Sequence, residues 1–483
     1  MDFRKIFDYI PEVVKPEEKK LDFNTKLKWT LIVLGGFFVL ANITLYGLSV
    51  NALERFEFLA TILAADFGSI ITLGIGPIVM ASIILQLLSG AGIINIDQTT
   101  TEGKRFFMGV QKLLVFFFII FEASVYVLMK GLQAEPVLGG FGPLILILQL
   151  ILGGTAIYYM DEVCNKWGFG SGVSLFIAAG VSRQLFTTAF QFINQQGRNC
   201  LLDFGNVACS GKVLVLLQSV INRYPIEFTS AIGAILATII IFLVVVWAQS
   251  LKVEIPLSFG RIRGYGVKWP LSFFYASVIP VILTAALIAN IQLFGGIIEN
   301  AAAPCFIEEG ICEGIANFAS HFTFLGHFVN GQPVSGLAFW LGSTNLLELF
   351  IRGGFLWTYL IQGITHILFF VVFCSIFSIF WVKTSGMDSH AQARNISASG
   401  LQVAGFRQDI RILESILDRY ILPLTVMGGI AIGLLASVTD LLGAMVGGTS
   451  ILLVIMIMFQ FYQSIAQQHS VDMNPAMRKF MGG

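Results

Sequence analysis

The sequence predicts an all-α polytopic membrane protein with ten transmembrane helices, arranged as two inverted halves of five helices each. Three observations predict this fold. Of the 483 residues, 56% are hydrophobic and only 12% are charged, which is too apolar for a water-soluble domain of this size. Ten apolar runs reach the roughly 20 residues that a helix needs to cross a hydrocarbon core about 30 Å thick. Finally, Lys and Arg are concentrated in alternate connecting segments, as expected for membrane helices.

The ten spans are placed on these apolar runs. The first 28 residues are polar and charged, so they are not expected to be a cleavable signal peptide, and the first span is expected to insert uncleaved. The spans are expected near residues 29–49, 70–90, 110–130, 142–161, 170–192, 229–251, 271–293, 357–381, 421–441 and 445–466.

The basic residues orient the spans. An even number of spans places both termini on one side, and the segments on that side carry 22 Lys and Arg, against six on the opposite side. The more basic side is the cytoplasmic side. We therefore expect a multi-pass protein of the cell membrane, with segment 1–28 and tail 467–483 in the cytoplasm.

The external connector 193–228 divides the chain into two halves, 29–192 and 229–466. Because five is an odd number of spans, the halves must have opposite orientations. Inverted repeats of this kind commonly place a working site near the midplane between them. Matching glycine-rich openings support the repeat: the fifth span opens with GFGSG and the tenth with GAMVGG.

The second span is predicted to be broken. Residues 58–89 form a mostly apolar stretch of 32 residues, which as one helix would reach about 48 Å at 1.5 Å per residue, well beyond the membrane. Asp66, Gly74 and Pro77 supply helix-breaking residues. We expect a short helix from Phe58 to Phe67 that enters from outside and returns, followed by a second helix. Irregular backbone at this depth must be buried or face a wet cavity, so the centre is hollow or plugged.

Aliphatic residues follow the glycine-rich breaks at comparable depth in both halves. Such residues around a hollow would hold back ions and water by dewetting. Ordinary helix packing explains the same residues, and spacing does not separate the two interpretations. The residues concerned are Ile75, Val79, Val173, Ile177, Ile282 and Leu452.

A few polar residues interrupt the apolar runs, among them Gln86, Glu122 and Asn290. Each is costly in hydrocarbon and needs a reason. Glu122 is either a proton-coupling residue or a hydrogen-bonding group at a helix interface. It has no basic partner inside the membrane, which favours the second interpretation.

Catalytic motifs are absent. The chain contains no phosphate-binding loop, zinc-type motif or nucleophile elbow, so we expect neither an enzyme nor a cofactor. His321 and His327 lie six residues apart without nearby acids in the sequence, which favours surface or packing residues over a metal site.

Two cysteine pairs lie in the external connectors. Cys200 and Cys209 are nine residues apart, and Cys305 and Cys312 are seven apart. Local disulfides and unpaired thiols both remain open, since disulfides persist outside the cell but Cα distances are not readable from sequence.

Two cytoplasmic loops, 252–270 and 382–420, are long and basic. The first is predicted to be a β-hairpin over 253–273. Anchoring of positive charge inside the cell explains the sign of the charge but not the length, so docking of a large anionic partner such as ribosomal RNA phosphate is a further hypothesis. The arginines concerned are Arg261, Arg263, Arg394, Arg407 and Arg411.

Several stretches closely resemble the archaeal SecY family, the central subunit of the protein-conducting channel and a relative of the eukaryotic Sec translocon alpha subunit. The resemblance covers the ten spans. The matching stretches are ITLGIGPIVMASIILQLL, GSGVSLFIAAGVS, IPLSFGRIRG, IPVILTAALIANIQ, VAGFRQDIR and RYILPLTV.

The resemblance implies two halves hinged externally between the fifth and sixth spans around an hourglass pore. Residues 58–67 would be the plug, including Phe58, Ile62, Leu63, Asp66 and Phe67. The six aliphatic residues named above would form the pore ring, with Val173 in place of the more usual isoleucine. Gln86, Glu122 and Asn290 would be polar contacts of a lateral gate, and the five arginines would dock a ribosome. Implied partners are the small SecE and Secβ subunits, the ribosome, signal sequences and nascent polypeptides, the signal recognition particle receptor and the lipid bilayer.

A secondary transporter is the main alternative, because inverted repeats and broken helices are common there too. Transporters usually carry several intramembrane charges, whereas this chain offers mainly Glu122 and Arg183. A structural scaffold is a third interpretation. The favoured function is passage of unfolded secretory polypeptides across the membrane, with lateral release of apolar segments into lipid.

Overall fold

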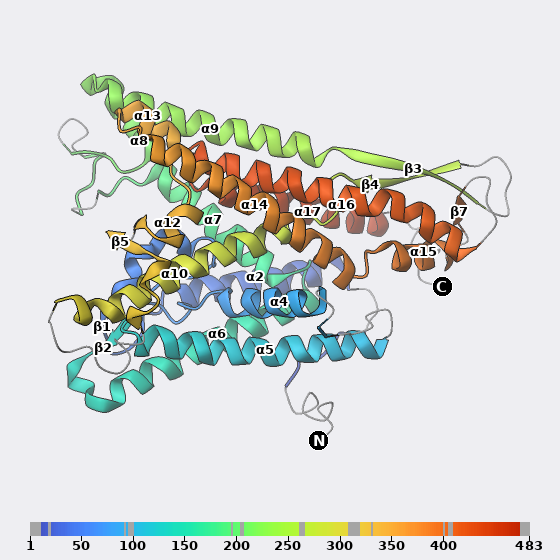
Figure 1. Cartoon of the computed structure of the whole chain (residues 1–483), viewed down its shortest axis with the longest axis horizontal. Helices are drawn as coiled ribbons and strands as arrows, with labels where there is room; N and C mark the ends of the chain where they lie inside the picture. The colour runs from blue at the N-terminus through green and yellow to red at the C-terminus, as the bar shows by residue number, and fades with distance from the viewer. Residues whose placement is uncertain are drawn as a thin grey trace.

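Long helices run roughly side by side in one elongated bundle (Figure 1). The computed structural model describes residues 11–17, 21–90, 93–94, 101–194, 197–202, 207–259, 266–307, 319–329, 332–398, 401–403 and 409–473. Within these ranges, nine helices are long and apolar enough to cross a membrane. The prediction of a mostly helical polytopic membrane protein is therefore confirmed.

The N-terminal half contributes five helices, one for each predicted span. The second, α4, is much shorter than expected. Its 15 residues reach only about 22 Å, less than the hydrocarbon thickness, so the preceding irregular segment must supply the remaining depth. Pro77 lies in the first turn of α4, where proline is well tolerated. The helices are α2 (Phe23–Ala41), α4 (Gly76–Gly90), α5 (Thr101–Leu128), α6 (Gly142–Trp167) and α7 (Gly172–Phe190).

The C-terminal half contributes the other five. Helix α10 begins at Ile279, later than the predicted residue 271. The reason is Ser277, whose φ of 62° interrupts helical geometry just before the helix. Helix α16 begins at Ile410, well before the predicted 421, and continues through Pro423. The helices are α9 (Pro225–Gln249), α10 (Ile279–Ile307), α14 (Trp357–Thr384), α16 (Ile410–Leu441) and α17 (Gly448–Met473).

Short elements gather at the two ends of the bundle (Figure 1). One end carries a three-stranded sheet in the order β4-β3-β7 and α15; these are β3 (Lys252–Phe259), β4 (Gly266–Ser272), β7 (Leu401–Val403) and α15 (Ser389–Ala398). The other end carries two antiparallel strand pairs, β1-β2 and β5-β6. Its strands and short helices are β1 (Leu48–Asn51), β2 (Leu132–Ala134), β5 (His327–Val329), β6 (Gln332–Ser335), α12 (Leu337–Leu341) and α13 (Leu346–Arg352). Three 3-10 turns, Ala52–Phe56, Pro136–Phe141 and Thr323–Leu325, complete the described elements.

The connector between the halves contains an apolar helix, α8 (Lys212–Asn222), that sequence analysis missed. The burial of its side chains is the reverse of that in a water-soluble amphipathic helix. Leu217, Val220 and Ile221 are exposed, whereas Gln218 and Ser219 are buried. The side-chain amide of Gln218 donates to the carbonyl of residue 207 at 2.7 Å and accepts from the backbone N–H of residue 209 at 3.0 Å. The buried polar residue thus ties the preceding loop to the helix.

Cys200 and Cys209 form a disulfide across this loop, with Cα atoms 5.3 Å apart. This decides the first of the two cysteine questions. The second lies outside the described residues, because the position of Cys312 and the side chain of Cys305 are not among them.

His327 has an acidic neighbour in the folded chain. The ring Nδ1 of His327 pairs with the carboxylate of Glu299 on α10, and the same carboxylate accepts from the backbone N–H of Phe328 at 2.9 Å. Glu299 lies 28 residues away in the sequence, so the residues next to the two histidines do not reveal this pairing. No group of three potential metal ligands occurs in the described part of the chain.

Gly153 of α6 packs directly on the irregular segment before α4. A Cβ atom at Gly153 would lie 1.8 Å from the carbonyl oxygen of Ile70. Because that obstacle is backbone, Gly153→Ala is expected to lower the midpoint of thermal unfolding in detergent, by the equivalent of about 1–3 kcal/mol for overpacking.

Gly35→Ala is the matched control, since nothing lies within 4 Å of its Cβ position on α2. It is expected to leave the midpoint unchanged or raise it slightly, because alanine favours helix. Equal losses in the two variants would contradict the close packing at Gly153.

Candidate functional site

The centre of the bundle holds the break in the second span. Helix α3 covers only Glu57–Ala60, residues 61–75 form turns, and α4 begins at Gly76. The predicted break is confirmed, but the predicted helix Phe58–Phe67 was wrong in length. The physical reason is Ala64, whose φ of 45° lies in the left-handed region and cannot continue a right-handed helix.

The turns satisfy their own backbone groups. The hydroxyl of Thr72 donates to the carbonyl of Ser69 at 2.6 Å and accepts from the N–H of Gly68 at 3.0 Å. The N–H of Ile75 donates to the carbonyl of Leu63 at 2.8 Å, which closes the segment on itself. Irregular backbone is tolerated at membrane depth only when it is satisfied and enclosed in this way.

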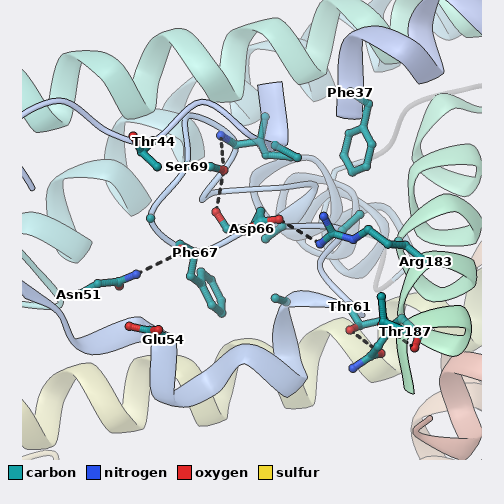
Figure 2. A pocket seen from close by; sticks show the side chains of 18 of the residues that line it. Phe37, Thr44, Asn51, Glu54, Thr61, Asp66, Phe67, Ser69, Arg183 and Thr187 are labelled. Carbon is teal, nitrogen blue, oxygen red and sulfur yellow. Dashed lines mark hydrogen bonds and ion pairs between the residues drawn. The ribbon is translucent and has the colours of Figure 1, made fainter. Parts of the chain in front are cut away.

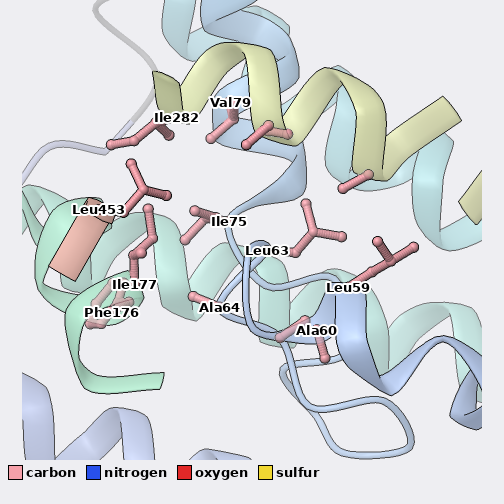
Figure 3. Close-up of a cluster of buried hydrophobic side chains, with 14 of the residues drawn as sticks. Leu59, Ala60, Leu63, Ala64, Ile75, Val79, Phe176, Ile177, Ile282 and Leu453 are labelled. Atoms are coloured by element: carbon pink, nitrogen blue, oxygen red, sulfur yellow. The ribbon is translucent and has the colours of Figure 1, made fainter. Parts of the chain in front are cut away.

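Aliphatic side chains from the break and from four helices converge at one place (Figure 3). Each of them is at most 4% exposed. The labelled members from the break, α4, α7, α10 and α17 are Ile75, Val79, Ile177, Ile282 and Leu453. Leu63 and Ala64 of the broken segment lie against the same cluster. We call this cluster the aliphatic constriction; it is closed by side chains.

The remaining predicted ring residues belong to the same apolar core. Leu452 is fully buried within it, and Val173 is partly buried against it. Sequence reasoning missed Leu453, the next residue on α17, and Phe176 on α7, both of which Figure 3 labels. One residue on a helix corresponds to a rotation of about 100°, which an apolar run without polar punctuation does not fix.

The predicted plug residues have different surroundings. Leu63 is buried in the constriction, Ile62 is half-buried, and the side chain of Phe58 lies outside the described residues. Asp66 and Phe67 line a cavity instead.

This cavity, of about 1000 Å³, lies between α2, the broken segment and α7 (Figure 2). Polar groups line part of it. The guanidinium Nη2 of Arg183 donates to Oδ2 of Asp66 at 2.9 Å. The hydroxyl of Thr61 donates to Oε1 of Gln184 at 2.7 Å. Both contacts join α7 to the broken segment.

The predicted gate residues are buried, and Gln86 lies apart from Glu122. Helix α4 packs against α10 and α14. Side-chain oxygens of Gln86, Glu122 and Asn290 have no hydrogen-bond partner among the described residues. The carboxylate of Glu122 lies close to Gly76, with 3.0 Å to the Cβ position there. Gln86 lies ten residues further along α4, about 15 Å at helical rise, so the two side chains do not meet.

The basic loops form one unit. The predicted hairpin is confirmed as the antiparallel pair β3-β4. Strand β7 of the second loop also pairs with β3, where Leu257 lies opposite Val403, and this was not predicted. Arg394 on α15 and Arg411 on α16 are exposed. Arg261, Arg263 and Arg407 lie outside the described residues.

A bundle that encloses an aliphatic constriction, an inserted non-helical segment and a polar cavity beside it has the architecture of a gated membrane channel. Comparison with known proteins gives the family. The SecY family model matches residues 69–462. The protein translocase subunit SecY of Methanothermobacter thermautotrophicus is 40% identical over 484 residues, which cover 99% of this chain and 98% of that protein. The chain belongs to the SecY family.

Solved structures agree over almost the whole length. One, on the plug domain of the SecY protein stabilising the closed state of the translocation channel, has 35% identity and a TM-score of 0.79 and covers 99% of both chains. Another, Sec61 in the canine ribosome-channel complex from the endoplasmic reticulum, has 36% identity, a TM-score of 0.76 and the same coverage. The protein is a non-enzymatic channel that translocates polypeptides across the membrane, and the transporter and scaffold alternatives are set aside.

Leu63 tests how the constriction is packed. Leu63→Ala is expected to lower stability by about 2–4 kcal/mol, because it leaves a cavity among fully buried side chains. Ile62→Ala is the control, since Ile62 is only half-buried, and is expected to lose clearly less. Thermal unfolding of the two purified variants measures the difference. A larger loss for Ile62→Ala would contradict the assignment of the buried face.

Proposed function

We propose that the segment 58–67 is the plug of this channel and that the aliphatic constriction is its seal. The observation that carries the proposal is the insertion of Leu63 and Ala64 among aliphatic side chains from both halves. A narrow apolar passage resists wetting, so ions and water are held back, yet it widens for a polypeptide because no covalent or ionic bond joins the aliphatic side chains that form it. The proposed seal comprises Ile75, Val79, Val173, Ile177, Ile282 and Leu452, together with Leu453.

We also propose that apolar segments leave sideways where α4 meets α10 and α14. Buried oxygens of Gln86, Glu122 and Asn290 have no hydrogen-bond partner in the described part of the chain, which reduces the stability of this closed seam. A signal sequence that moves through it into lipid gains on the order of 10 kcal/mol for a dozen leucine-class side chains. A polar chain gains nothing from lipid and continues outward.

The proposed orientation places the sheet β4-β3-β7, α15 and both termini in the cytoplasm, since the segments on that side carry 22 Lys and Arg. The halves 29–192 and 229–466 would then hinge at the external connector 193–228. A related structure is a ribosome-channel complex. We propose that Arg261, Arg263, Arg394, Arg407 and Arg411 bind ribosomal RNA phosphate. SecE, Secβ, nascent polypeptides and the signal recognition particle receptor follow as partners from the family resemblance.

Deletion of residues 58–67 tests the plug. Removal of the inserted side chains is expected to raise resting ion conductance in planar bilayers at least several-fold, because Leu63 and Ala64 then no longer occupy the constriction. Ile177→Asn is expected to raise conductance less, since it wets one wall only.

Leu236→Asn is the control for the point variant. Leu236 is an exposed side chain of α9, and its replacement is expected to leave conductance unchanged. If the deletion conducts no more than the unaltered protein, the proposed plug is wrong.

Arg407→Glu tests ribosome docking. Reversal of this charge is expected to weaken ribosome binding roughly tenfold at low salt and to reduce the dependence of binding on salt concentration, since fewer counterions are released. Co-sedimentation with ribosomes over a salt series measures both. Arg198→Glu reverses an exposed charge in the external connector and is expected to bind normally; equal binding by the two variants would remove the docking proposal.

A further inference from the structure

Two consecutive residues of α7 reach two points on the broken segment. Arg183 contacts Asp66 at 2.9 Å and Gln184 contacts Thr61 at 2.7 Å (Figure 2). The two contacts lie on either side of Ala64, whose φ of 45° is in the left-handed region. Together they fix both the position and the rotation of this segment relative to α7.

The broken segment therefore has two faces. Leu59 and Leu63 are fully buried in the apolar core, whereas Thr61 and Asp66 line the cavity beside α7. Helix α7 contacts both faces: Ile177 belongs to the constriction, and Arg183 lies six residues further on, about 9 Å along the helix. Helix α7 thus contributes a residue to the aliphatic constriction and also makes the polar contacts to the broken segment.

We propose that Arg183 and Gln184 form a polar latch that holds the plug segment closed, with Arg183 as the main positioning residue. This inference rests on the proposed plug role of residues 58–67. It assigns a function to an intramembrane arginine that polypeptide passage does not otherwise use. A cation in a membrane helix is costly and is retained where it has a partner and a task.

The ion pair of the latch is weak enough to break when the channel opens. The side chain of Arg183 is 47% exposed and that of Asp66 is 34% exposed, so the ion pair is partly screened and contributes modestly. Its loss is expected to raise the population of displaced plug about two- to fivefold. A much stronger latch would keep the channel closed even when substrate is present. Without any latch, only apolar contacts would hold the plug segment, and these do not fix its orientation.

The experiment measures resting open probability of the purified full-length channel, with any co-purifying subunits, in planar bilayers without substrate. Asp66→Asn and Arg183→Gln are each expected to raise it about two- to fivefold. The charge swap Asp66→Arg with Arg183→Asp is expected to return it to within twofold of the unaltered protein. A merely structural contribution would not be restored by the swap, because the swap inserts a larger side chain in the turn.

Arg198→Gln is the control, since it removes an exposed external arginine outside the latch, and is expected to change nothing. If either latch variant fails to assemble, Thr61→Val removes only the hydroxyl contact to Gln184 and is expected to give a smaller increase in open probability. Unchanged open probability in the latch variants, or no recovery in the swap, overturns the latch.

Deletion of 58–67 in the same bilayers separates the two proposals. A conducting deletion with silent latch variants would overturn the latch and leave the plug role intact. A silent deletion would overturn the plug role itself, and the latch with it.

Discussion

Irregular backbone at membrane depth must find all its hydrogen bonds inside the protein, and the architecture around residues 61–75 follows from this constraint. Side-chain hydroxyls and a closing bond from Ile75 to Leu63 satisfy the turns from within. The loop after α2 satisfies others: the N–H of Leu45 donates to Gly68 and the N–H of Ile70 donates to Ile43, both at 2.9 Å. Helix α6 covers the segment closely enough that Gly153 has no room for a side chain. A broken span therefore needs an enclosing bundle.

The centre of the bundle separates two kinds of interaction. Apolar contacts fill the constriction and exclude water, but they do not fix the orientation of the segment. The polar contacts from α7 to Thr61 and Asp66 fix its orientation and contribute little to stability. A channel for polypeptides needs both, because its resting state must be tight to ions and its opening must not require breaking a deeply buried ion pair. Far from the centre, the pairing of β7 with β3 joins the two basic loops into one sheet.

Local and periodic features were predictable from the sequence, and long-range pairings were not. Apolar runs located the spans, glycines and Pro77 located the break, and turn residues located the β3-β4 hairpin. The helix over 58–67 was overestimated because nothing in ILAADF signals a left-handed Ala64. Helix α8 was missed because its 11 residues are too few to span and its polar residues face inward. Asp66 and Arg183 were each noticed alone, but their contact joins positions 117 residues apart; the unpaired cation in a span was the available signal.

We propose that polypeptides pass through the aliphatic constriction between the two halves. Site-specific photo-crosslinking tests it most directly, with a photoreactive residue placed at the midpoint of a secretory polypeptide that is stalled during translocation. The account predicts crosslinks to residues from both halves at one depth, Val79 and Ile177 from the first and Ile282 from the second. Crosslinks confined to the exposed apolar side chains of α9, with none to the constriction, would contradict it.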